Sequence, residues 1–383
     1  MESFEFNLRT GLVFGVGSID RVGTISKELS FTRPLLVADK GLQAAGHVER
    51  VVALLRDAHL DAVPFHEFDV NPDSEMITQG AVFARSQKVD SIIGLGGGSS
   101  LDCAKGINFV LSNGGTMADY RGYGKATKPM LPMIAAPTTA GTGSEAQSYA
   151  VISDAETKIK MACGDPKAAF RVAILDPELT LSQPEAVTAA AGFDAIAHAV
   201  ETAVTTRRNA ISAMYSREAF CLLNHHFENV LETPHDVMAR AAMQLGAFYA
   251  GIAIEQSMLG AAHACANPLT ARFQMAHGVA LGIILPHVVR WNAQTSADLY
   301  RELISNSDKP RETMTTMDSG LQLADRLVNI GNACGFPSRL RDTGVLENDL
   351  EALARAAAEQ WTGTFNPRPF STSGALEVYE CAY

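Results

Sequence analysis

The feature of this sequence that most limits its fold is a change in pattern about halfway along the chain. Up to about residue 180, short apolar runs rich in β-branched residues alternate with stretches of helical spacing. Parallel strands joined by helical crossovers produce this alternation. Strands are expected at 34–38, 91–95 and 133–136, and helices at 48–58 and 101–111. The first part of the chain is therefore predicted to be an α/β domain with a parallel, Rossmann-like sheet.

After about Pro184 the β-branched runs fade and alanine-rich helical segments replace them. The clearest cover residues 185–205, 237–264 and 317–334. A length of 383 residues suits two domains better than one. We therefore predict an α/β domain over residues 1–182 and an all-helical domain over residues 183–383, packed around a cleft.

Composition excludes several classes of function. The net charge of −11 is spread without long runs of one sign, which argues against a nucleic-acid or anionic-membrane partner. No signal peptide is expected, and no window approaches the ~18–20 apolar residues of a membrane span. Six cysteines occur without a C-x-x-C pair, a pattern typical of reduced thiols in a cytoplasmic protein.

A glycine cluster follows the predicted strand at 91–95. Gly96, Gly97 and Gly98 precede Ser99 and Ser100, and a helical stretch begins directly afterwards. Glycines let the backbone approach a ligand closely, and the amides at a helix start attract anions such as a pyrophosphate. The usual G-x-G-x-x-G fingerprint is not matched, so a tight turn without a ligand is the alternative for this segment alone.

A second loop of similar character follows the strand at 133–136. It reads PTTAGTGSE over residues 137–145 and offers threonine hydroxyls to a ribose or phosphate. Asp39, at the end of the strand at 34–38, can accept hydrogen bonds from ribose hydroxyls and would repel a 2′-phosphate. The two loops and this aspartate together predict an NAD site and disfavour NADP, although a solvated turn aspartate remains the alternative at Asp39.

Four side chains of the helical part suggest a metal site. Asp194 and His198 lie four residues apart in an apolar stretch, so on a helix they share one face. Burying this pair is costly unless it is hydrogen-bonded or binds a metal. His263 is expected to end a helix that Pro268 breaks, and His277 to open the next one. Three imidazoles and one carboxylate suit Fe²⁺ or Zn²⁺, whereas an Asp–His pair with two unrelated histidines is the alternative.

Several motifs, in this order, resemble the iron-containing (group III) alcohol dehydrogenases. They are FGVGSID at 14–20, NPD at 71–73, GGGSSLDCAK at 96–105, PTTAGTGSE at 137–145, GFDAIAHAVE at 192–201 and NPRPFS at 366–371. The resemblance covers essentially the whole chain. It implies the architecture shared with dehydroquinate synthase, with a dinucleotide-binding domain, a helical metal-binding domain and the metal between them.

The resemblance also implies which residues bind the cofactors. The positions that hold the metal in this family correspond to Asp194, His198, His263 and His277. The positions that build its NAD site correspond to Asp39, Asn71, Gly96, Gly97, Gly98, Ser99, Ser100, Thr138, Thr139, Thr142, Val151 and Lys160.

One position departs from the family pattern. Many members carry a second, non-ligand histidine after the third ligand, where this chain has Asn267. Asparagine forms hydrogen bonds but does not titrate near neutral pH. Asn267 can contact a substrate, but the resemblance does not by itself imply the usual proton relay or the family's diol specificity for this chain.

These features predict a metal-dependent, NAD-linked dehydrogenase that interconverts a small primary alcohol or diol and its aldehyde or ketone. The ion, iron or alternatively zinc, would act as a Lewis acid while nicotinamide accepts a hydride. A glycerol dehydrogenase-like or other NAD- and zinc-dependent enzyme of the same fold is the main alternative, and a non-catalytic, metal-stabilised homologue is another. The family leads us to expect a homodimer or larger homo-oligomer.

Overall fold

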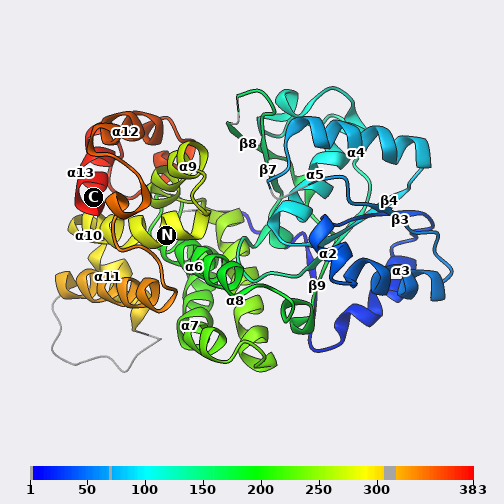
Figure 1. Ribbon diagram of the computed structural model, residues 1–383, viewed down its shortest axis with the longest axis horizontal. Helices are drawn as coiled ribbons and strands as arrows, with labels where there is room; N and C mark the ends of the chain where they lie inside the picture. Colours follow the sequence, from blue (N-terminus) through cyan, green and yellow to red (C-terminus); the bar gives the residue numbers. More distant parts are fainter. Residues whose placement is uncertain (1–2, 69–70, 158, 306–315) are drawn as a thin grey trace. The chain divides into compact units, whose positions relative to one another are not determined.

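The computed structural model describes residues 3–68, 71–157, 159–305 and 316–383 (Figure 1). Their contacts form two compact units. One unit is Asn7–Gln183, and the other is Pro184–Tyr383 together with the amino-terminal segment up to Phe6. The predicted fold class is confirmed, because the first unit contains a parallel sheet and the second is built of helices.

The first unit is organised around a six-stranded sheet whose paired strands are parallel. The strand order is β1-β9-β6-β4-β2-β3. In that order the strands cover Gly11–Phe14, Val172–Leu175, Met133–Pro137, Ser91–Gly96, Pro34–Val37 and Val63–Phe65. A smaller sheet has the order β5-β8-β7, with strands at Gly122–Tyr123, Lys160–Gly164 and Tyr149–Ser153.

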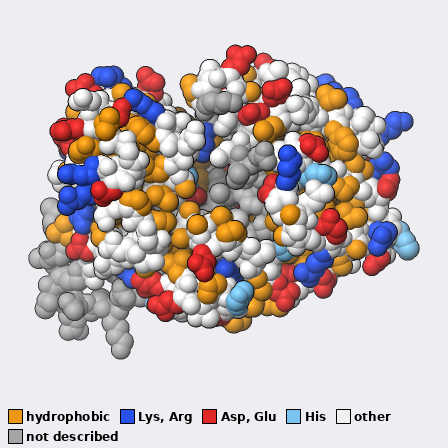
Figure 2. All heavy atoms as spheres, viewed as in Figure 1, with side chains coloured by type: hydrophobic (Ala, Val, Ile, Leu, Met, Phe, Trp, Pro, Cys, Tyr) orange, Lys and Arg blue, Asp and Glu red, His pale blue; other side chains and the backbone are white. Residues whose placement is uncertain are grey.

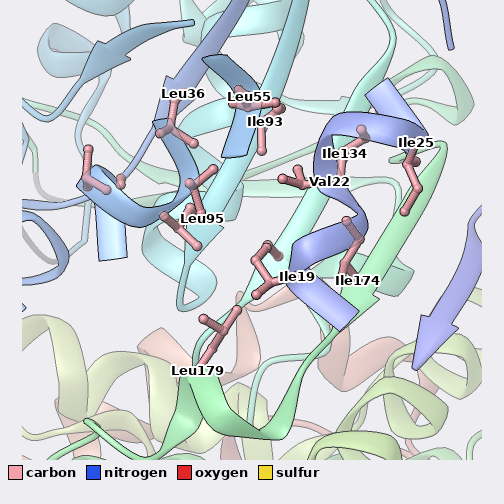
Figure 3. Packing of buried hydrophobic residues seen from close by; sticks show 14 of the residues in the cluster. Ile19, Val22, Ile25, Leu36, Leu55, Ile93, Leu95, Ile134, Ile174 and Leu179 are labelled. Atoms are coloured by element: carbon pink, nitrogen blue, oxygen red, sulfur yellow. The ribbon is translucent and has the colours of Figure 1, made fainter. Parts of the chain in front are cut away.

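Three helices of this unit share one apolar core with the sheet (Figure 3). They are α1 (Val22–Glu28), α2 (Lys40–Ala44) and α3 (His47–Asp57), whereas α4 (Ser74–Gln87) and α5 (Gly98–Asn113) pack against each other outside this cluster. Val22 and Ile25 of α1 and Leu55 of α3 pack in one buried cluster with strand residues such as Leu36 and Ile93. Burying each large aliphatic side chain contributes about 1.5–3 kcal/mol, so this cluster fixes the layer of helices on the sheet.

The strand order reverses between β2 and β4. From β2 the chain proceeds to β3 on one side, whereas β4 pairs with the other side of β2. In open parallel sheets, ligands bind beyond the carboxyl ends of the strands at such a reversal. Asp39 directly follows β2, and the glycine cluster directly follows β4, so both lie at this point of the sheet.

The second unit consists of α6 (Glu185–Thr202), α7 (Ala210–Glu232), α8 (Val237–Ser257), α9 (Ala261–Phe273), α10 (His277–Ile304), α11 (Thr316–Ala333), α12 (Leu350–Ala358) and α13 (Thr372–Ala382). The expectation of one helix over 237–264 was wrong, because Met258 has a positive φ of 68° and ends α8. His263 therefore lies in the first turn of α9.

Pro268 does not break α9, contrary to the sequence prediction. It is buried inside the helix, which continues to Phe273. Proline removes one backbone hydrogen bond, but α9 packs against α10 and α12, and most helical stability in proteins comes from such packing.

The sequence expectation that no segment has the character of a membrane span needs correction at α8. This helix is long and apolar enough to pass such a test by length and composition. However, 72% of the relevant window is buried within the protein, and α8 packs against α6 and α7. These contacts identify α8 as a core helix of the second unit.

Candidate metal centre and nucleotide-binding loops

Three helices of the second unit bring the four predicted metal ligands together. Asp194 and His198 lie one turn apart on α6, where the surrounding residues are apolar and buried. His263 comes from the first turn of α9, and His277 is the first residue of α10. Asp194, His198 and His263 are buried, whereas the side chain of His277 is 24% exposed.

The reactive atoms converge on one carboxylate oxygen. Asp194 Oδ1 lies 3.2 Å from His198 Nε2, 3.4 Å from His263 Nε2 and 3.9 Å from His277 Nε2. One ligand atom from each of Asp194, His263 and His277 lies within 4.8 Å of the others. His198 is outside that trio, but its ring stacks on the His263 ring with centroids 4.8 Å apart.

This arrangement fits a small divalent ion. Ligand atoms placed about 2.1 Å from one tetrahedral ion lie about 3.4 Å from each other. Asp194 Oδ1 and His263 Nε2 are buried, and within the described part of the chain neither has a hydrogen-bond partner. An ion between these atoms would satisfy both, and one carboxylate with three imidazoles suits Fe²⁺ or Zn²⁺.

The electrostatics of the cluster keep its carboxylate ionised. Burial alone would raise the pKa of Asp194, but His198 and the two other imidazoles lower it well below its usual value. Burial lowers the pKa of His263, whereas Glu201 and Asp194 raise it, with a net result of about 9. The cluster therefore attracts positive charge, either a proton or a metal ion.

Two contacts beyond the ligands were not predicted from the sequence. Glu201, seven residues after Asp194 on α6, is buried and accepts a short hydrogen bond from His263 Nδ1. His277 Nδ1 lies 3.4 Å from Thr270 Oγ1. The spacing of Asp194, His198 and Glu201 was the available signal for Glu201, because i, i+4 and i+7 share one helix face.

In the first unit, the two predicted nucleotide loops lie against each other. Thr138 N donates to Gly96 O at 3.1 Å. A Cβ at Gly97 would lie 3.1 Å from Thr139 Cγ2, and one at Gly98 would lie 2.5 Å from Thr142 Cγ2. Glycine is therefore required for this close approach, and both loops can address one ligand at the start of α5.

Asp39 and Asn71 are also connected to this segment. Asp39 Oδ1 accepts from Leu42 N at 3.1 Å and so caps α2, while Asp39 Oδ2 accepts from Ser100 Oγ at 3.2 Å. Asn71 adopts a positive φ of 59°, and its backbone N–H donates to Ser99 Oγ at 3.1 Å. Both residues thus lie beside the serines that begin α5.

An ion pair between a buried lysine and a partly buried aspartate ties the loops to the smaller sheet. Lys105 Nζ, fully buried on α5, donates to Ser144 O at 2.7 Å and to Tyr149 O at 2.6 Å. Asp102 lies 3.7 Å from Lys105 Nζ and accepts from Ser144 Oγ at 2.6 Å and from Val151 N at 3.0 Å. Val151 on β7 therefore has a direct link to α5.

Lys160, the remaining predicted NAD residue, lies on β8. In the register of the smaller sheet it pairs with Ser153, while Val151 pairs with Ala162. Burial raises the pKa of Asp102, and the charges of Lys105 and Lys160 oppose that rise. Lys160 is thus close enough to α5 to act on Asp102.

Comparison with known proteins identifies the family of the chain. Residues 10–177 match the family described as iron-containing alcohol dehydrogenase, and residues 188–383 match its carboxyl-terminal domain family. The chain belongs to the iron-containing alcohol dehydrogenase family. The family predicted from the sequence motifs is therefore confirmed, together with the enzyme class and the use of iron.

Named relatives of this alcohol dehydrogenase span its whole length. It is 32% identical to the NAD-dependent methanol dehydrogenase of Bacillus methanolicus, over 97% of each chain. It is also 32% identical to the 1,3-propanediol dehydrogenase of Citrobacter freundii, over 97% of this chain and 96% of the relative. A crystal structure of 1,3-propanediol oxidoreductase superimposes with a TM-score of 0.96 at 30% identity, covering 100% of both chains.

The structure shows the surroundings of Asn267, the position where the sequence departs from the family pattern. Asn267 follows His263 by one turn on α9, and its Nδ2 donates to Gln360 Oε1 at 3.2 Å. Neither amide titrates near neutral pH, so this pair cannot relay a proton as a histidine can.

Proposed function

We propose that this alcohol dehydrogenase interconverts small primary alcohols or diols and their aldehydes or ketones with NAD. The observation that carries the proposal is the convergence of Asp194 Oδ1 with the Nε2 atoms of three histidines. The methanol and 1,3-propanediol dehydrogenases among its relatives support a small, neutral substrate.

The residues of the chain have distinct tasks in this proposal. Asp194, His198, His263 and His277 would hold Fe²⁺, which would supply a Lewis acid beside the substrate oxygen. The amides at the start of α5 bind the pyrophosphate, and Thr138, Thr139 and Thr142 offer hydroxyl groups to it or to the ribose. Val151 and Lys160 extend the site along β7 and β8.

The proposal is tested by metal analysis of protein purified without oxygen, combined with a panel of short alcohols and aldehydes. We expect bound iron and alcohol-dependent formation of NADH. His277→Ala should abolish both, and survival of both would show that the ligand set is wrong. If the active protein contains zinc, the metal of the proposal changes from iron to zinc, while the proposed ligands stay the same.

The preference for NAD over NADP rests on Asp39. Its carboxylate would accept hydrogen bonds from the ribose hydroxyls and repel a 2′-phosphate. Asp39→Asn removes the charge but keeps an oxygen that can cap α2, so it is a cleaner test than Asp39→Gly. Both variants should raise the activity with NADP relative to NAD, and an unchanged ratio would exclude the ribose contact.

We further propose a cytoplasmic homodimer that binds neither nucleic acid nor membrane. β1 is an edge strand with exposed apolar side chains at Leu12 and Phe14, and Leu8 and Val16 beside it are exposed as well. Such an edge is a template for pairing with a second copy. None of the six cysteines, all of which lie in the described part of the chain, forms a disulfide, and the face drawn in Figure 2 intersperses acidic and basic side chains. Light scattering after gel filtration tests the dimer.

A further inference from the structure

The start of α9 depends on residues from distant parts of the chain. Its N-cap, Gly260, has no side chain to bind the first amides of the helix. Asn366 Oδ1 accepts from Ala261 N at 3.2 Å, and Glu201 Oε1 accepts from Ala262 N at 2.6 Å. Both acceptors are buried, so the helix that carries His263 is anchored at its first turn.

Glu201 also holds the side chain of His263 directly. While Oε1 binds the backbone of α9, Oε2 accepts from His263 Nδ1. The carboxylate oxygen accepts this hydrogen bond, so Nδ1 is the donor and carries a proton. The neutral imidazole then has its lone pair on Nε2, the atom that lies 3.4 Å from Asp194 Oδ1.

Asn366 and Gly260 keep this carboxylate in place. Asn366 and Asn292 exchange two amide hydrogen bonds, of 2.9 Å and 2.8 Å. A Cβ at position 260 would lie 3.0 Å from both Glu201 Oε1 and Asn366 Oδ1. Glycine leaves the room in which the two acceptors reach the start of α9 side by side.

We propose that Glu201 is a positioning residue that fixes His263 as an Nε2 metal ligand, with Asn366 and Gly260 supporting it. This inference rests on the metal site of the proposed function. Hydrogen bonds from a metal-bound histidine to a carboxylate fix the ring and strengthen the ligand, and their loss commonly weakens metal binding by about 10–100-fold.

Glu201→Gln tests this role with almost no change in size. Glutamine has one acceptor oxygen, so it cannot serve both Ala262 N and His263 Nδ1. If its oxygen binds the backbone, its NH₂ group faces Nδ1 and favours the tautomer with a proton on Nε2, which cannot bind a metal. We expect Fe²⁺ affinity, measured by competition with a ferrous chelator, to fall by about 10–100-fold. Gly260→Ala should give a smaller loss by displacing the carboxylate.

The controls separate this inference from the proposed function. Glu377→Gln, which changes a carboxylate at the surface of the same unit, should bind iron like the wild type. Equal affinity of wild type and a folded Glu201→Gln variant would overturn the positioning role while leaving the metal site intact. A wild type that binds no iron would instead overturn the proposed function.

A measurement on the wild type keeps the inference testable if both variants fail to fold. Histidine ¹⁵N chemical shifts of the zinc-loaded protein report which ring nitrogen carries the proton, and His263→Gln identifies the signal. We expect a protonated Nδ1 and a metal-bound Nε2 at His263. An unprotonated Nδ1 would contradict the proposed role of Glu201.

Discussion

Each compact unit places a carboxylate at or near its core, partly buried at Asp102 and buried at Asp194, but the two differ in where the compensating charge comes from. In the α/β unit, Asp102 lies beside the buried ammonium of Lys105 and accepts hydrogen bonds from Ser144 and Val151. In the helical unit, Asp194 faces three imidazoles, and among the described residues no lysine or arginine forms an ion pair with it.

This difference separates a structural cluster from a candidate metal site. A buried charge is costly unless the protein or a ligand neutralises it. The chain supplies its own cation at Asp102, and the result is a fixed link from α5 to Ser144 and β7. At Asp194 the carboxylate faces imidazoles, and a divalent ion bound there would balance its charge.

The largest effect is expected from Asp194→Asn. The variant keeps the shape of the side chain but removes the charge that the ion needs. A Lewis acid contributes several kcal/mol to such a reaction, so kcat/KM for an alcohol should fall at least about 10³-fold, together with the iron content. Steady-state kinetics and metal analysis check this. Retained activity would show that Asp194, like Asp102, does not depend on a bound metal ion.

Lys105→Met should mainly affect stability. Removing one partner of a buried ion pair typically costs about 3–5 kcal/mol, here with the loss of hydrogen bonds to Ser144 and Tyr149. Urea unfolding measures the loss, and iron content should not change. Combining Lys105→Met with Asp102→Asn should recover part of the stability. A loss below about 1 kcal/mol would mean that Asp102 does not need its lysine.

Iron itself should stabilise the folded protein. A ligand that binds only the folded state adds about 2.7 kcal/mol when its free concentration is a hundred times its Kd. Thermal unfolding of the metal-free protein at increasing Fe²⁺ should therefore show a rising Tm, and Asp194→Asn should abolish the rise. If the Tm of the wild type does not change with the Fe²⁺ concentration, the helical unit needs no external cation.

A smaller, pH-dependent effect is expected at Glu145, beside the Lys105 cluster. Burial raises its pKa from 4.5 to about 7. The folded state therefore holds a proton that the unfolded state releases, and the resulting stability is complete below pH 4.5 and lost by about pH 7. Between pH 5 and 7 the loss should be about 2 kcal/mol. Urea unfolding of the wild type at several pH values should show this fall in the free energy of unfolding. In Glu145→Gln the part of the fall that Glu145 causes should be absent.

Asn267→His should have the smallest effect. It introduces a group that titrates near pH 6.5 one turn from His263. We expect a new inflection in the pH profile of kcat/KM, with a change of less than about tenfold, because the wild-type pair with Gln360 does not titrate. An unchanged profile would show that position 267 has no part in proton transfer.

The sequence predicted the fold class because its two periodicities are long and distinct. The nucleotide loops could be located because glycines and threonines follow short apolar strands, and those strands lie side by side in the sheet. The four candidate metal ligands could be selected because charged or imidazole groups stand out in apolar helices, and the binding of a metal by them stays a prediction. The NAD contacts themselves stay a prediction.

The supporting contacts could not be predicted because they join residues that are far apart in the chain. Asn366 reaches Ala261, and Asp102 reaches Ser144 and Val151, through tertiary packing alone. The start of α9 was also misplaced, since an alanine-rich sequence does not reveal the positive φ at Met258 or the external acceptors that allow a new helix to begin. Among these supporting residues, Glu201 alone had a signal in the sequence, namely its spacing from Asp194 and His198 on α6.

Because the ligands come from α6, α9 and α10, a bound ion would work as a reversible cross-link between three segments of the helical unit. Protein made when iron is scarce would lack that cross-link, and the three segments would separate by local unfolding more often. Proteases cut such opened states, so the abundance of the enzyme would follow the supply of its metal.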